Sequence, residues 1–159
     1  MRGRFLLGLL LSAVLLTVCG CVRPLKTDAP MTSFSFSHSG MHSGLIYTLS
    51  AEKDGDGWRA DLSLLAGDRE YELDMTEEEA EALNALVETH KLTGWNGFDK
   101  VDRLALDGTD FELRIGYEDG QEVCASGSNA FPKGYREARE AILELFGEMM
   151  ERNGMENPF

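Results

Sequence analysis

The sequence predicts an α+β domain in which an antiparallel β-meander sheet carries two α-helices packed on one face, in the order ββββ-α-βββ-α. Four runs of alternating apolar and polar residues precede a helical pattern, about three further runs follow it, and a second helical pattern ends the chain. Asp-Gly or Gly-Asp pairs separate several of the runs, which is typical of hairpins. A doubly wound fold would need strands and helices in alternation, and that order is absent.

The first twenty residues have the pattern of a signal peptide. Arg2 and Arg4 form a short basic region, and the fourteen residues 5–18 that follow are almost wholly apolar. This apolar run is short for a membrane span, which needs about 20 residues.

A short motif, Val18-Cys19-Gly20-Cys21, ends this region. It resembles the lipobox of bacterial lipoproteins: an aliphatic residue, a tolerant position, a small residue and the modified cysteine. The resemblance implies that cleavage removes residues 1–20 and that Cys21 becomes a lipidated N-terminus with two or three acyl chains, which attach a protein far more stably than one chain. A secretory signal without lipid and an uncleaved anchor are the alternatives.

The resemblance also implies a location and a domain organisation. We expect a lipid anchor in the cell membrane or outer membrane, on the exported side. Val22 follows Cys21 in place of an aspartate, which in a two-membrane envelope resembles a lipoprotein sorted to the outer membrane. Residues 21–31 are predicted to be a tether, residues 32–153 a single α+β domain, and residues 154–159 a C-terminal tail.

The predicted mature chain is strongly acidic. The full sequence has 15 Lys and Arg against 28 Asp and Glu, and residues 1–20 contain two of the arginines and no acid. The mature net charge is therefore −15, from 13 basic and 28 acidic residues. This argues against a nucleic acid partner and against docking of the domain body onto anionic lipid. Cys124, the remaining cysteine, is interpreted as a small half-buried residue without a disulfide partner.

Turn geometry predicts the strand pairing, because partners in an antiparallel hairpin share a face. A strand at 34–38 is expected to return through the loop 39–44 onto Leu45. Two-residue turns are predicted at 54–55, 67–68 and 108–109. The pairs that these turns imply include Ala51 with Trp58, Leu64 with Tyr71, Leu106 with Phe111 and Leu104 with Leu113.

The last hairpin has two alternatives. A two-residue turn at 119–120 would set Ile115 opposite Cys124. A three-residue turn with Gly120 in the left-handed region sets Ile115 opposite Val123, and the apolar pattern favours it. Cys124 then lies on the other face of the sheet, beside Gly116.

Two helices are expected. Thr76 and Glu79 form a capping box for a helix that runs to about Lys91. The second helix should begin near Pro132 and stop at Gly154. Its apolar stripe consists of Tyr135, Ala138, Ile142, Leu145, Phe146 and Met149.

The segment "SFSFSHSGMHSG", residues 33–44, combines serines with His38 and His42. A serine hydrolase would need one serine beside a histidine that an acid orients, and the sequence has no Gly-x-Ser-x-Gly elbow. Ordinary strand patterning is favoured, with His38 on the apolar side. These two histidines and His90 match no metal-ligand spacing, and "DGDG" at 54–57 fits a turn better than a calcium loop. We expect no metal and no cofactor.

Large aromatic residues lie in two Gly- and Asn-rich connections, "GWNGF" at 94–98 and "GSNAFP" at 127–132. If exposed, Trp95, Phe98 and Phe131 would mark a contact surface; burial at the sheet edge is favoured. Asn129 is a candidate helix cap. With "DGTDFELRIGYEDG", these stretches resemble a set of uncharacterised bacterial lipoproteins over about residues 94–146. That resemblance implies no activity.

We interpret the chain as a membrane-anchored envelope lipoprotein that acts as a non-catalytic binding or accessory module. Its expected partners are the membrane, through Cys21, and an envelope protein. An envelope hydrolase that uses His38 or His42 is one alternative, and a structural spacer is the other.

The anchor makes a direct prediction for intact mass. Protein extracted from membranes should have the mass of residues 21–159 plus two or three acyl chains, and Cys21→Ser should lose both the cleavage and the added mass. A wild-type mass without acyl chains would make this a freely secreted domain.

Overall fold

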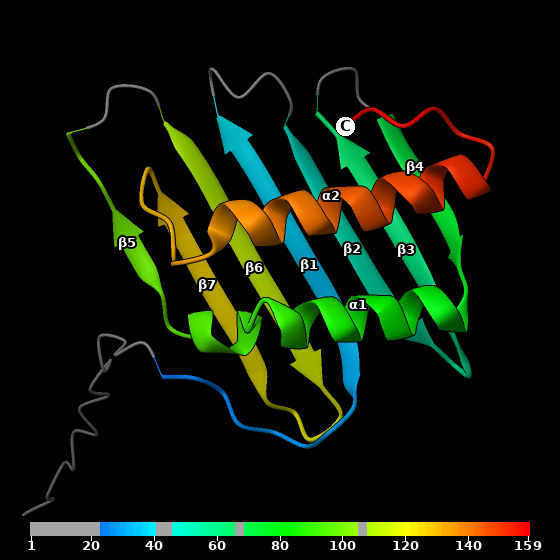
Figure 1. Cartoon of the computed structure of the whole chain (residues 1–159), viewed down its shortest axis with the longest axis horizontal. Helices are drawn as coiled ribbons and strands as arrows, with labels where there is room; N and C mark the ends of the chain where they lie inside the picture. Colours follow the sequence, from blue (N-terminus) through cyan, green and yellow to red (C-terminus); the bar gives the residue numbers. More distant parts are fainter. Residues whose placement is uncertain (1–22, 41–45, 66–68, 105–107) are drawn as a thin grey trace, which may run out of the picture.

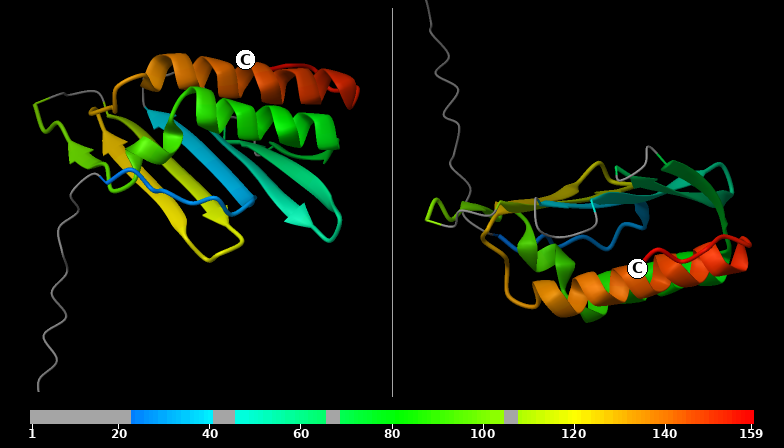
Figure 2. Two further views of the ribbon diagram at one scale, coloured as in Figure 1. Left: turned by 60° about the horizontal axis from the view of Figure 1, so that its bottom comes forward. Right: turned by 90° about the horizontal axis from the view of Figure 1, so that it is seen from above.

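The computed structural model describes residues 23–40, 46–65, 69–104 and 108–159. The predicted fold class is confirmed, because in these residues seven strands form one mostly antiparallel sheet and both α-helices cover the same face of it (Figures 1 and 2). The elements are β1 (Met31–Gly40), β2 (Tyr47–Asp54), β3 (Gly57–Leu64), β4 (Arg69–Met75), α1 (Glu77–Thr89), the 3₁₀-helix η1 (Leu92–Trp95), β5 (Asp99–Val101), β6 (Thr109–Tyr117), β7 (Glu122–Ser128) and α2 (Tyr135–Arg152).

The strand order across the sheet is β4-β3-β2-β1-β6-β7-β5. The first strand of the chain therefore lies in the middle of the sheet and pairs antiparallel with both β2 and β6 (Figure 1). The first four strands form one half of the sheet and the last three form the other. The pairing of β1 with β6 joins the two halves.

Alternation along each strand produces the core. In β1, Phe34, Phe36 and His38 are buried under the helices, as expected, and the serines between them face the other side. Phe36 lies opposite Leu49 of β2 and Leu113 of β6, so one apolar row continues across the boundary between the halves. Full burial of a side chain of this size contributes about 1.5–3 kcal/mol.

The first two predicted hairpin registers are wrong by two residues. Asp54 pairs with Gly57, so the turn residues are Gly55 and Asp56, and Gly55 has a φ of 61°. Ala51 therefore lies opposite Ala60, and Trp58 lies opposite Lys53 and Met75. A shift of two residues keeps every side chain on its face, so alternation alone does not distinguish the two registers.

The same shift occurs in the next hairpin. Leu64 pairs with Arg69 and Leu62 with Tyr71, so the connection is longer than the predicted two-residue turn. Residues 67–68, where that turn was predicted, lie outside the described residues, as does Leu45, the expected first residue of the second run.

The predicted hairpin at 108–109 is also wrong. Leu104 is 92% exposed and lies outside any strand, and Leu106 falls outside the described residues. Leu113 instead pairs with Phe36 and Ala125, because β1 and β7 occupy the two sides of β6. The short β5 pairs parallel with β7 at the edge of the sheet.

The last hairpin has the favoured three-residue turn. Ile115 lies opposite Val123, and Gly120 adopts a φ of 77°, a left-handed conformation that glycine takes without steric cost. Cys124 lies on the open face of the sheet, as predicted, with Arg114 opposite it. Its side chain is exposed, which corrects the expectation that it is half-buried.

The first helix begins as the capping box predicts. The Glu79 amide donates to Thr76 Oγ1 at 3.2 Å, and the Thr76 amide donates to Glu79 Oε2 at 2.7 Å. Such a cap contributes about 1 kcal/mol. Arg152 Nε at the far end of α2 donates to Glu79 Oε1 at 2.7 Å and ties the two helices together.

The second helix begins at Tyr135, three residues later than predicted, after Gly134 at a φ of 81°. Its predicted stripe is buried except for Leu145, which is partly buried. Asn129 does not cap it. Its Oδ1 accepts a hydrogen bond from the Thr109 amide at 2.8 Å, so this side chain fixes the start of β6.

The packing around β7 can be tested by a substitution at Gly127. A Cβ atom there would lie 2.0 Å from the Ala130 carbonyl oxygen and 2.7 Å from Phe111 Cε1. We expect Gly127→Ala to lower the free energy of unfolding by at least about 2 kcal/mol in urea denaturation, because a backbone atom cannot move aside cheaply. The control is Gly94→Ala, where nothing lies within 4 Å of the added carbon; equal effects of the two variants would contradict this packing.

Candidate functional site

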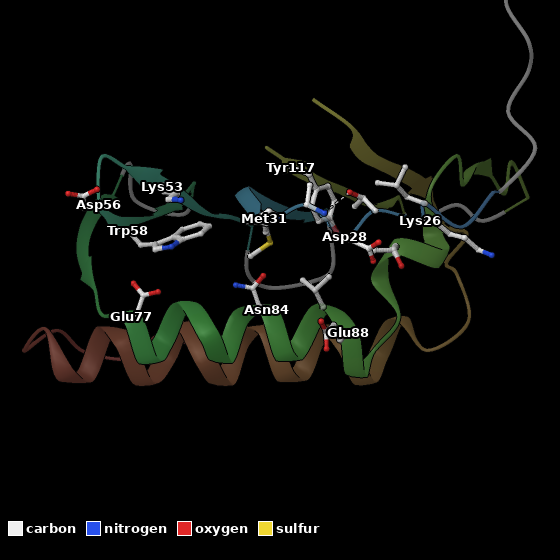
Figure 3. Close-up of a pocket in the computed structure, with 16 residues that line it drawn as sticks. Lys26, Asp28, Met31, Lys53, Asp56, Trp58, Glu77, Asn84, Glu88 and Tyr117 are labelled. Carbon is white, nitrogen blue, oxygen red and sulfur yellow. Dashed lines mark hydrogen bonds between the residues drawn. The ribbon is translucent and has the colours of Figure 1, made fainter. Parts of the chain in front are cut away.

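The described residues form an open groove of about 850 Å³ between α1 and the sheet. The N-terminal segment 25–30 forms one wall and α1 forms another (Figure 3). Residues of β1, β2, β3, β6, η1 and the β2–β3 turn complete the lining. Ligand sites in proteins commonly have volumes of about 300–1,000 Å³. The groove is therefore large enough for a small molecule or a short peptide segment.

The N-terminal wall is held at its first residues by backbone hydrogen bonds. The Arg23 amide donates to the Asn96 carbonyl and the Leu25 amide to the Thr93 carbonyl, each at 3.0 Å. Residues 23–30 of the predicted tether thus lie against the domain rather than standing free of it. The C-terminal tail also packs on the domain, where Phe159 contacts the Tyr47 ring edge-on at 5.5 Å between centroids.

The other end of this wall is held by the turn between β6 and β7. Thr27 Oγ1 donates to Asp119 Oδ2 at 2.7 Å, and the Glu118 amide donates to the Pro30 carbonyl at 3.0 Å. The Thr27 hydroxyl, together with hydrogen bonds from Gln121, lowers the pKa of the Asp119 carboxyl. Asp119 therefore stays ionised and keeps the segment fixed beside the groove.

The inner surface of the groove is partly apolar. Trp58 and Met31 lie on the sheet side, and Glu77 and Asn84 point toward them from α1 (Figure 3). The register shift in the first hairpin matters here, because it places Trp58, at the start of β3, opposite Lys53, which also lines the groove, instead of opposite Ala51. No local sequence pattern predicts this groove; the Trp58 indole directly after the turn at 54–57 was the available signal.

Acidic groups outnumber basic ones around the groove. The charged residues that line it are Asp28, Asp56, Glu77, Glu88, Lys26 and Lys53. Lys53 Nζ is already paired with Glu118 Oε1 at 3.0 Å. Burial, and then the nearby carboxylates of Asp119 and Glu88, raise the pKa of the Tyr117 hydroxyl, so this group stays a neutral donor at the rim. The groove can therefore attract a cationic group and stack a flat or apolar one.

His38 does not line the groove. It is only 6% exposed, its Nδ1 is 2.9 Å from the Tyr135 hydroxyl, and its ring stacks on Tyr47. Arg139 Nε donates to the Tyr47 hydroxyl at 2.8 Å and completes this cluster. Burial, and then the charge of Arg139, lower the pKa of His38 to about 4. His42 lies outside the described residues, and the hydrolase hypothesis stays a prediction.

The aromatic residues of the two Gly- and Asn-rich connections differ in burial. Trp95 and Phe98 are buried, as favoured, and both rings contact Phe111. Phe131 is 40% exposed and packs against Tyr135 in a tilted arrangement, at 4.5 Å between centroids. Two of the three therefore fill the edge of the sheet.

Across the described ranges, no group of three or more His, Cys, Asp or Glu side chains is arranged to hold a metal ion. The "DGDG" stretch forms the β2–β3 turn. None of the helices between residues 23 and 159 that the structure describes is long and apolar enough to cross a bilayer. Cys21 precedes the described residues.

Comparison of the chain with protein-family models and with curated proteins gives no match.

The buried His38 predicts a pH dependence of stability. Its pKa is about 4 in the folded protein against an ordinary 6.5, so the unfolded chain binds a proton first as the pH falls. The free energy of unfolding should therefore decrease between pH 6.5 and 4, by on the order of 3 kcal/mol from this group. His38→Phe should remove that part of the difference between urea denaturation at pH 7.5 and at pH 4.5.

Tyr135→Phe is the matched control for this measurement. It removes the hydrogen bond to His38 but keeps a buried imidazole, so its pH dependence should stay close to that of the wild type. If His38→Phe retains the full wild-type pH dependence, the imidazole is not the group that titrates.

Proposed function

We propose that this chain is an exported lipoprotein, anchored to a membrane through Cys21, whose domain is a non-catalytic binding module. The observation that carries the binding role is the groove between α1 and the sheet, with the Trp58 indole on one side and Glu77 on the other. The groove favours a binding module over a structural spacer, which would need no such cavity.

The ligand that suits the groove carries a positive charge on an apolar stem. Four carboxylates line it against two lysines, and Glu118 already pairs with one of these lysines. The face of an indole attracts cations, and the attraction strengthens where water is partly excluded. A lysine- or arginine-containing segment of an envelope protein has this chemistry, which agrees with the partner class expected from the sequence.

The link between anchor and groove supports the same proposal. The wall formed by residues 25–30 follows Cys21 by only a few residues. Hydrogen bonds at Arg23, Leu25, Thr27 and Pro30 hold this wall in place. Anchoring at Cys21 would therefore keep the groove close to the membrane, where envelope proteins present their segments.

Short peptides of opposite charge test the binding role. We expect an acetylated Lys-Leu-Lys-Leu amide to bind the mature protein in isothermal titration calorimetry at low salt, and the matched Glu-Leu-Glu-Leu amide not to bind. Glu77→Gln should weaken binding by roughly threefold to tenfold, because one partly exposed charge contact contributes on the order of 1 kcal/mol.

Glu81→Gln provides the control. Glu81 lies on the same helix, is exposed and does not line the groove, so it changes the net charge equally. Binding of both peptides, or an equal loss in the two variants, would show that net charge rather than the groove governs the interaction.

A further inference from the structure

We propose that the β5 edge of the domain lies against the membrane that holds the anchor, with Val101 and Leu104 inserted among the lipids. This inference rests on the proposed lipidation of Cys21. It adds to the binding module a fixed orientation and a second point of contact with the bilayer.

The length of free chain sets the first constraint. The Arg23 amide is bound to the Asn96 carbonyl, just before β5. Cys21 precedes Arg23 by two residues, and two residues span at most about 7 Å. A lipidated Cys21 would therefore bring the bilayer surface close to Asn96, and the domain could not hang away from the membrane on a long tether.

The geometry of the edge sets the second constraint. β5 is the outermost strand of its half, and its backbone follows β7 from the Gly97 amide on the Cys124 carbonyl to the Asp102 amide on the Ser128 carbonyl. Figures 1 and 2 show the first described residues, in blue, beside the start of this edge. The first described residues, which follow the proposed anchor by two positions, and the far end of β5 thus lie on one side of the molecule, so a bilayer along that side can contact this end of β5 while it holds the anchor.

The side chains at the far end suit a lipid surface. Val101 is 60% exposed and Leu104 is 92% exposed, and both lie at or just after the end of β5. Transfer of exposed apolar side chains of this size from water into lipid is favourable. The charges beside them are balanced, with Lys100 and Arg103 against Asp99 and Asp102. The acidity of the whole domain therefore does not oppose contact at this edge.

The orientation can be measured by electron paramagnetic resonance on the acylated full-length mature protein in phosphatidylcholine vesicles. Cys124→Ser removes the exposed thiol, and a nitroxide is then attached through Leu104→Cys. A second sample carries the nitroxide through Leu65→Cys. Leu65 is 63% exposed but follows β3, four strands away from β7 and five from β5.

We expect the ratio of collisions with oxygen, which concentrates in lipid, to collisions with a water-soluble nickel chelate to be several times higher at position 104 than at position 65. Equal, low ratios at both positions on protein whose mass shows the acyl chains would overturn the orientation and leave the anchor intact. Protein without acyl chains would overturn this proposal together with the proposed anchor, and intact mass on the same sample distinguishes the two cases.

Discussion

The antiparallel pairing of β1 with β6 is the contact on which the rest of the structure depends. It joins residues 31–40 to residues 109–117, far apart in the sequence, and turns two small hairpin systems into one seven-stranded sheet. The apolar row through Leu49, Phe36 and Leu113 continues across this junction. A sheet gains independent stability from an apolar face and from helices packed against it, and the joined sheet offers a face long enough for α1 and α2 to lie side by side on it (Figure 2).

The groove is a consequence of how α1 is attached to this sheet. The capping box at Thr76 starts the helix directly after β4, at the same end of the sheet as the β2–β3 and β6–β7 turns. The helix therefore begins beside Trp58. The N-terminal segment crosses this end of the sheet and is bound to both η1 and the β6–β7 turn. It thus forms a wall of the cavity and not merely a connection to the proposed anchor.

At the other end of the sheet, a small group of hydrogen-bonded polar side chains lies among aromatic rings. His38 is hydrogen-bonded to Tyr135 and Arg139 to Tyr47 where α2 meets the central strands, and the His38 ring stacks on Tyr47. Low exposure keeps the imidazole neutral, and the Tyr135 hydroxyl occupies its Nδ1. This arrangement accounts for a histidine among the phenylalanines of β1 through packing, and it links the start of α2 to the centre of the sheet.

The sequence by itself determined the fold class, the faces of the strands, the capped start of α1 and the Gly120 turn, since periodicity and local turn chemistry act over a few residues. It also carries the lipobox pattern on which the proposed anchor rests. Only the tertiary structure decided the registers of the first two hairpins, because a two-residue shift leaves every face unchanged. It likewise decided that Leu113 faces Phe36 instead of Leu104, and that residues 23–30 pack against the domain. These features, and the groove they create, depend on contacts between distant segments, which compete for the same strand edges in a way that no local pattern records.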